Sequence, residues 1–117
     1  MTGDTDMRSN QEIVRDSFRA YETGDRELVE TLLADDFTFS SPADVAIDRA
    51  RYFERCWPNA GNLVHFAFTR VIESGDEVVV TYEAERVDGS RFRNTEVHTV
   101  TGGMVRGVEV YFGWNLE

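Results

Sequence analysis

The sequence predicts an α+β fold in which three N-terminal helices pack on a curved antiparallel sheet. In the first half of the chain, apolar residues recur at helical spacing, whereas the second half alternates with a period of two. Glycine-containing turns separate four long alternating segments, which is typical of antiparallel hairpins. A length of 117 residues fits one domain. We expect residues 9–117 to form it and residues 1–8 to be a disordered tail.

The first two helices are expected to form a hairpin. Ser9 and Glu12 have the spacing of a capping box, and Gly24 is placed to end the helix in a left-handed conformation. Asp25 can then cap a second helix at once. The two predicted apolar faces are Ile13, Val14, Phe18 and Tyr21, and then Leu28, Val29, Leu32 and Leu33.

A short strand and a third helix follow in the prediction. Residues 36–41 alternate as a strand does, and Pro42 ends it. Residues 43–47 are expected to be a loop. Asp48 can cap the third helix, which Pro58 stops. The predicted inward face of this helix is Ala50, Phe53, Cys56 and Trp57.

The remaining sequence predicts a meander of four strands, at residues 63–73, 77–87, 91–101 and 104–114. Strands of about 11 residues span roughly 36 Å, so the sheet must twist and curve. Three helices can cover only one face of such a sheet. We therefore expect a cavity between the helices and the concave face.

Composition excludes several classes of function. The formal charge is −10, which disfavours nucleic-acid and membrane partners. All 12 basic residues are Arg, so lysine Schiff-base chemistry is excluded. Cys56 has no cysteine partner, and His65 and His98 are not in a metal-binding pattern, so we expect no metal and no cofactor. Without an apolar signal or membrane segment, the predicted location is cytoplasmic.

The third meander strand carries the candidate catalytic residues. Phe92 favours an inward face that also holds Asn94, Glu96 and His98, whereas Val97 favours the opposite face. If Phe92 points inward, a carboxylate and an imidazole project into an apolar pocket. Glu96 is then either a general acid/base or a structural carboxylate paired with Arg or Tyr. His98 either shares its proton or is a core residue with satisfied hydrogen bonds.

The walls of the expected pocket follow from strand parity and from the third helix. On the last strand, the apolar face consists of Val108, Val110, Phe112 and Trp114. Asp44 lies near the predicted mouth, where it is either a second catalytic carboxylate or a solvated loop residue. The residues that we predict to bind a ligand are Asn94, Tyr82, Phe53, Trp57, Val110, Phe112 and Trp114.

Four stretches carry a resemblance to a known family. They are Tyr21-Glu22-Thr23-Gly24-Asp25, Leu33-Ala34-Asp35-Asp36-Phe37, Ser41-Pro42 and Val108-Glu109-Val110-Tyr111-Phe112-Gly113-Trp114. Through them the chain resembles the NTF2-like superfamily, and its SnoaL-like branch in particular. The resemblance implies an α+β cone and a homodimer packed through the outer sheet face, which Tyr111 and Val97 would suit.

The resemblance also bears on catalytic residues. Ketosteroid isomerases of this superfamily use a base, an oxyanion tyrosine and an oxyanion carboxylic acid, at the positions of Ser41, Ser17 and Glu96. Only Glu96 retains a suitable group. SnoaL-type cyclases depend chiefly on one acid/base carboxylate, which again matches Glu96. The acid–base relay of limonene epoxide hydrolases has no assignable counterpart here.

Three functions remain open from the sequence. The first is an isomerase, cyclase or dehydratase that acts on a small apolar carbonyl or polycyclic substrate, with Glu96 and His98 as catalytic residues. The second is a binding protein that holds such a molecule without turnover. The third is a dimeric interaction domain whose cavity its own side chains fill.

Overall fold

The computed structural model describes residues 9–116, so the predicted tail at residues 1–8 lies outside the described part of the chain. The fold belongs to the predicted α+β class, and the four meander strands are confirmed close to their predicted bounds. In chain order the elements are α1 (Asn10–Thr23), α2 (Arg26–Leu32), β1 (Leu33–Ser41), β2 (Asp44–Asp48), α3 (Arg49–Arg55), the 3-10 helix η1 (Trp57–Asn59), β3 (Leu63–Ser74), β4 (Glu77–Arg86), β5 (Arg91–Thr101) and β6 (Met104–Leu116).

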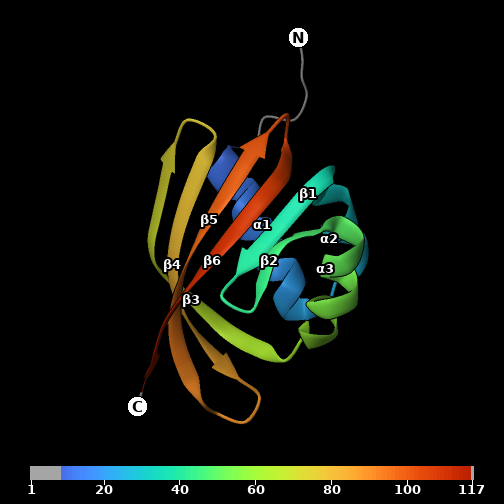
Figure 1. Cartoon of the computed structure of the whole chain (residues 1–117). Helices are drawn as coiled ribbons and strands as arrows, with labels where there is room; N and C mark the ends of the chain where they lie inside the picture. Colours follow the sequence, from blue (N-terminus) through green and yellow to red (C-terminus); the bar gives the residue numbers. More distant parts are fainter. Residues whose placement is uncertain (1–8, 117) are drawn as a thin grey trace.

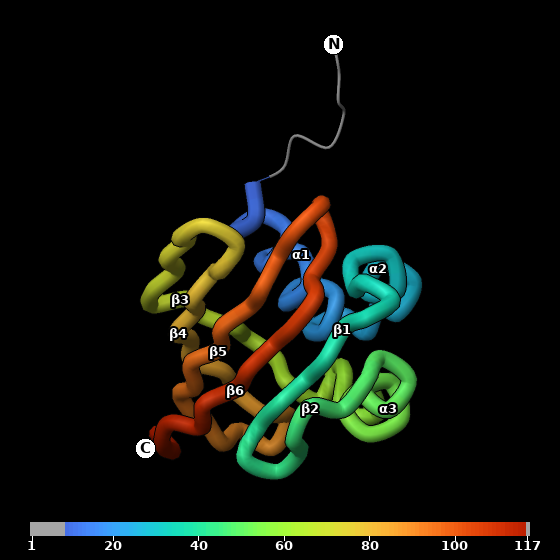
Figure 2. The backbone as a smooth tube through the Cα atoms, turned by 45° about the horizontal axis from the view of Figure 1, so that its top comes forward, coloured from blue at the N-terminus to red at the C-terminus, as the bar shows by residue number. Residues whose placement is uncertain are grey.

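The six strands form one sheet in the order β2-β1-β6-β5-β4-β3. Strands β3 to β6 pair antiparallel in sequence order, whereas β1 lies parallel to β6. The sheet is therefore mixed, and the expected purely antiparallel sheet is wrong at this pair. The predicted strand at residues 36–41 is confirmed within β1 and precedes the third helix as expected, whereas β2, which also precedes α3, was not predicted. The helices lie on one face of the sheet (Figure 1 and Figure 2).

The predicted caps of the first helix are confirmed. Ser9 Oγ accepts a hydrogen bond from the Glu12 backbone N–H, and the Glu12 carboxylate accepts one from the Ser9 backbone N–H. Gly24 ends α1 at a φ of 73°, a conformation that glycine adopts without a Cβ clash. Asp25 and Asp48 cap α2 and α3, also as predicted. None of the helices within residues 9–116 is long and apolar enough to cross a membrane.

Residues 43–47 are not the loop that the sequence predicted. They belong almost entirely to β2, which pairs antiparallel with β1. Two serine side chains stabilise the reversal: Ser41 Oγ accepts hydrogen bonds from the backbone N–H groups of Ala43 and Asp44, and Ser40 Oγ accepts one from Ala46. The turn is therefore built by side-chain capping, which hydrophobic alternation does not reveal.

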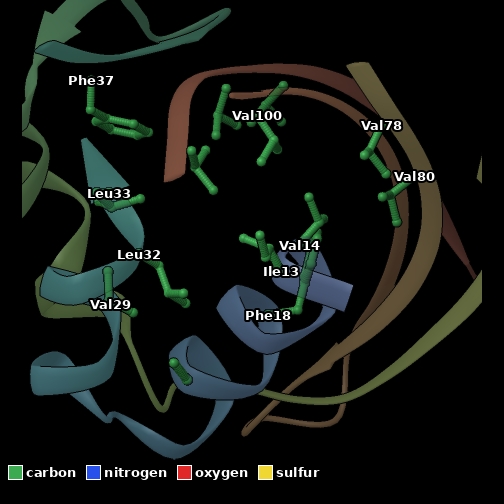
Figure 3. Close-up of a cluster of buried hydrophobic side chains, with 14 of the residues drawn as sticks. Ile13, Val14, Phe18, Val29, Leu32, Leu33, Phe37, Val78, Val80 and Val100 are labelled. Atoms are coloured by element: carbon green, nitrogen blue, oxygen red, sulfur yellow. The ribbon is translucent and has the colours of Figure 1, made fainter. Parts of the chain in front are cut away.

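The core lies between α1 and the concave side of the sheet. Ile13, Val14 and Phe18 point from α1 toward the curved strands, where Val78 and Val80 are completely buried (Figure 3). Burying side chains of this size stabilises the fold by about 1.5–3 kcal/mol each relative to leaving them exposed. This apolar contact holds the helices over one part of the sheet.

A β-bulge at Gly113 reverses the alternation of β6. Asn94 pairs with Phe112 and Arg93 pairs with Trp114, so Gly113 is an extra residue on β6. Phe112 therefore keeps the inward parity, whereas Trp114 moves to the outer face, where it is 61% exposed and its ring stacks with the Arg93 guanidinium. The prediction of Trp114 as a cavity wall is wrong for this reason.

We predict that Gly113→Ala destabilises the protein. A Cβ at this position would lie 2.1 Å from the Arg93 carbonyl oxygen, which belongs to the backbone and has little freedom to move. We expect a loss of about 1–3 kcal/mol in the free energy of unfolding, measured by urea denaturation. Gly107→Ala is the matched control on the same strand, because its Cβ would meet nothing closer than 3.6 Å. Equal losses in the two variants would contradict this account of the bulge.

Candidate active site

A cavity of about 440 Å³ lies between the helices and the sheet. Its walls are mainly apolar and aromatic, and they include Phe18, Phe39, Tyr52 and Phe66. Cavities of this size and composition, with a few polar groups, are typical of small-molecule sites. Two polar clusters interrupt the apolar walls, one on the sheet and one where β1, β2 and α3 meet.

The first cluster is centred on Glu96 of β5. Its side chain lines the cavity and is only 14% exposed. The Tyr82 hydroxyl donates a hydrogen bond to Glu96 Oε2 at 2.7 Å, and His98 Nε2 lies 2.9 Å from Oε1. Phe92 and His98 are buried on the same face as Glu96, so the inward alternative for this strand is the one adopted. Strand alternation thus brings the two predicted catalytic residues together.

A single proton must lie between Glu96 and His98, because two unprotonated atoms would not form this contact. His98 is 4% exposed, and its ring packs beside Phe18 with 5.6 Å between the ring centres. Within residues 9–116 no group bonds His98 Nδ1. The imidazole is therefore held by apolar packing and by the carboxylate alone, which leaves the shared proton as its main polar link.

Three tyrosines surround this carboxylate. Burial, followed by the nearby Glu96 charge, raises the pKa of Tyr82 far above its ordinary value. Burial also raises the pKa values of Tyr21 and Tyr52, with Glu96 as a further cause in both. All three hydroxyls are thus neutral donors at physiological pH. Tyr21 donates to the Cys56 carbonyl oxygen, while Tyr52 lines the cavity and has no hydrogen-bond partner within the described residues.

The second cluster contains Asp44 and Arg55. Arg55 Nε lies 2.6 Å from Asp44 Oδ1, and the two side chains are 44% and 14% exposed. Asp44 is therefore neither a free loop residue nor an isolated carboxylate. Burial and then the Asp44 charge raise the pKa of the nearby Cys56 thiol to about 11, so this thiol is neutral at physiological pH. The sequence predicted that Asp44 lies near the mouth of the cavity, but it did not identify Arg55 as a site residue.

The predicted inward face of the third helix is confirmed only in part: Phe53 is buried in the core and Cys56 lines the cavity. Tyr52 and Arg55 of α3 also line it, as does Asn59 of η1. Phe53 instead packs under the guanidinium groups of Arg26 and Arg49 and does not line the cavity, and Trp57 packs against Tyr21 outside the lining. Ala50 is exposed. The prediction assumed that the most apolar face of the helix lines the cavity. Phe53, however, contacts Arg26 of α2, so part of this apolar face packs between the helices.

The other predicted ligand-binding residues divide into two groups. Tyr82, Val110 and Phe112 line the cavity. Asn94 does not, because its Oδ1 accepts a hydrogen bond from the Gly113 backbone N–H at 3.1 Å and so supports the bulge. Within residues 9–116, no group of three or more His, Cys, Asp or Glu side chains is placed to hold a metal ion.

Comparisons with known proteins identify the family and the fold. A family model described as the SnoaL-like domain matches residues 14–108. An NTF2-like protein of unknown function from Cytophaga hutchinsonii has a TM-score of 0.75 at 17% identity, over 97% of this chain and 95% of that one. No curated protein matches the sequence.

Two further solved structures carry functional descriptions. A protein described as a candidate ketosteroid isomerase from Kribbella flavida has a TM-score of 0.78 at 22% identity, over 92% of this chain and 80% of that one. An LEH-like epoxide hydrolase from M. tuberculosis has a TM-score of 0.74 at 17% identity, over 89% of this chain and 78% of that one. At these identities the likeness is one of fold.

We predict that the protein loses stability steeply in alkali. The folded-state pKa values of Tyr21, Tyr52 and Tyr82 lie above the ordinary value of 10, so the unfolded chain releases protons first as the pH rises. The stability that these neutral hydroxyls contribute is therefore complete below pH 10 and is lost above it. The expected slope is up to about 1.4 kcal/mol per pH unit for each tyrosine.

The measurement is the free energy of unfolding from urea denaturation between pH 9 and pH 11.5, for the unsubstituted chain and for Tyr82→Phe. The variant removes one titrating group, so its slope should be shallower by about one proton. An unchanged slope would show that Tyr82 titrates alike in the folded and unfolded states.

Proposed function

Because the chain belongs to the SnoaL-like domain family, we propose that its cavity binds a small, largely apolar molecule with a carbonyl group and that Glu96 moves a proton on it. The observation that carries this proposal is the Glu96 carboxylate, which lies among aromatic walls and is bonded to both His98 and Tyr82. The reaction would be an isomerisation, cyclisation or dehydration, since each can begin by removing a proton from the carbon next to a carbonyl group.

In this proposal Glu96 accepts the proton from carbon, while His98 keeps its hydrogen bond to the carboxylate and holds it in place. Negative charge then develops on the carbonyl oxygen of the substrate and needs a hydrogen-bond donor. Tyr52 supports this role, because its neutral hydroxyl lines the cavity without a partner within the described residues. Ser17 and Ser41 also line the cavity, but they lack the acidity of a tyrosine or a carboxylic acid.

A second candidate is ligand binding without turnover. It is favoured by the fact that both Glu96 oxygens already have partners in the protein. A carboxylate held in this way can serve as a polar anchor rather than as a base. Native mass spectrometry of the purified protein distinguishes the two candidates: a bound molecule recovered unchanged after incubation supports binding alone.

We predict that Glu96→Gln abolishes turnover while the fold persists. The test measures isomerisation of a panel of bicyclic and steroidal β,γ-unsaturated ketones by the absorbance of the conjugated product. Loss of the general base should lower the rate by about 10²–10⁴-fold. Glu30→Gln is the control, because Glu30 is exposed on α2, pairs with Arg26 and does not line the cavity. Full activity in Glu96→Gln would exclude the proposed base.

We further propose that the protein is a cytoplasmic homodimer joined through the outer face of the sheet. Apolar side chains on this face include Ile72, Tyr111 and Trp114, which are 51–61% exposed. Val97 lies between them on β5 and is half-buried. Exposed apolar groups gathered on one sheet face support an interface, since soluble monomers seldom present a large apolar patch to water.

If this interface is correct, Val97→Glu should give a monomer in sedimentation-velocity experiments, because the new carboxylate would be buried between the subunits without a partner. Val87→Glu is the matched control, since Val87 is 66% exposed in the turn between β4 and β5. A dimer that survives Val97→Glu, or an unsubstituted chain that is a monomer, would contradict the proposed interface.

A further inference from the structure

The second polar cluster of the cavity has no role in the proton transfer proposed above. It brings together Ser41 from the end of β1, Asp44 from the start of β2, Arg55 from the end of α3 and Asn59 from η1. The Arg55–Asp44 ion pair joins the end of α3 to the start of β2, and Ser41 Oγ accepts a hydrogen bond from the Asp44 backbone N–H; β2 leads directly into α3 (Figure 1). Four polar side chains from separate elements line this part of a mainly apolar cavity, which indicates a site for a polar part of the ligand.

Arg55 is the basic centre of this cluster. Its only ion-pair partner within residues 9–116 is Asp44, and the pair uses Arg55 Nε. The two Nη groups are thus left to bind something else. Guanidinium groups bind carboxylates with two parallel hydrogen bonds, a geometry that the Nη atoms can supply. The Asp44 carboxylate holds the Nε side and thereby orients the guanidinium.

The net negative charge of the protein makes the binding of an anionic ligand depend on Arg55. The protein carries a formal charge of −10, so an anionic ligand is repelled unless a local cation compensates. Arg55 is the only arginine among the described residues that line the cavity. We therefore propose that Arg55 binds the carboxylate of an elongated ligand, an apolar acid whose other end reaches Glu96. This inference rests on the proposed binding of an apolar molecule, and it adds the chemical class of that molecule.

The two polar clusters of the cavity are not bonded to one another. No hydrogen bond or ion pair within residues 9–116 joins the Asp44–Arg55 pair to Glu96, His98 or Tyr82. Aromatic and aliphatic side chains supply most of the remaining lining. A ligand that satisfies both polar clusters therefore needs an apolar body with a polar group at each end: the carboxylate at Arg55 and the reacting carbonyl at Glu96.

The test compares carboxylates with their uncharged primary amides. The probes are 2-naphthylacetate, 4-phenylbutanoate and decanoate, each paired with the amide of the same carbon skeleton. Binding to the purified full chain is measured by isothermal titration calorimetry at low ionic strength. We expect the carboxylate to bind about tenfold more tightly than its amide, because a charge-assisted pair is the difference between them.

Arg55→Gln should remove this preference and leave amide binding within about twofold, because only the charge-assisted contact is lost. Arg51→Gln is the matched control: Arg51 lies on the same helix, pairs with Glu54 and does not line the cavity. Because Arg55→Gln leaves Asp44 without its partner, the double variant Asp44→Asn/Arg55→Gln repeats the test without an unpaired carboxylate. Asp44→Asn alone should strengthen carboxylate binding.

The outcomes separate this inference from the proposed reaction. Equal binding of acids and amides, or a preference that survives both Arg55 variants, would overturn the role of Arg55 even if Glu96→Gln abolishes turnover. Full turnover in Glu96→Gln, with the preference lost in Arg55→Gln, would overturn the base and support the carboxylate site. If none of the six probes binds the unsubstituted chain, both proposals are contradicted, since each requires an apolar ligand in this cavity.

Discussion

The packing of Phe18 against the curved sheet is the contact on which the rest of the structure depends. Its ring meets those of Phe66, Phe68 and Tyr82 edge to face, with ring centres 5.1–5.3 Å apart, and lies next to His98. This one side chain therefore attaches α1 to three strands and also restrains the two residues that bond Glu96. Edge-to-face aromatic pairs are directional, so the contact sets orientation as well as burial.

The cost of burying polar groups explains why the site is organised in pairs. A carboxylate that is 14% exposed among aromatic rings is destabilising unless it accepts hydrogen bonds, and Glu96 accepts one from Tyr82 and shares a proton with His98. Asp44 meets the same requirement through Arg55. The cavity therefore has two polar parts, the Glu96 cluster and the Asp44–Arg55 ion pair, and the rest of its lining is mainly apolar.

The bulge at Gly113 places two nearby aromatic residues of β6 on opposite faces of the sheet. Phe112 lines the cavity and Trp114 faces outward, although they are two residues apart and would share a face in a regular strand. Because of this one change in register, Phe112 is the last residue of β6 that lines the cavity, and Trp114 adds to the apolar side chains on the outer face. A glycine is needed there because the Arg93 carbonyl occupies the space of a Cβ.

Local signals by themselves determined much of the fold. The Ser9 and Glu12 capping box, the turns around the meander and the strand alternation that pairs Glu96 with His98 act over a few residues, so they can be read from the sequence. The tertiary structure alone decided the parallel pairing of β1 with β6, the face of α3 that carries Arg55, and the outward position of Trp114. Each of these depends on which distant segment lies alongside, and a periodic pattern contains no information about that neighbour.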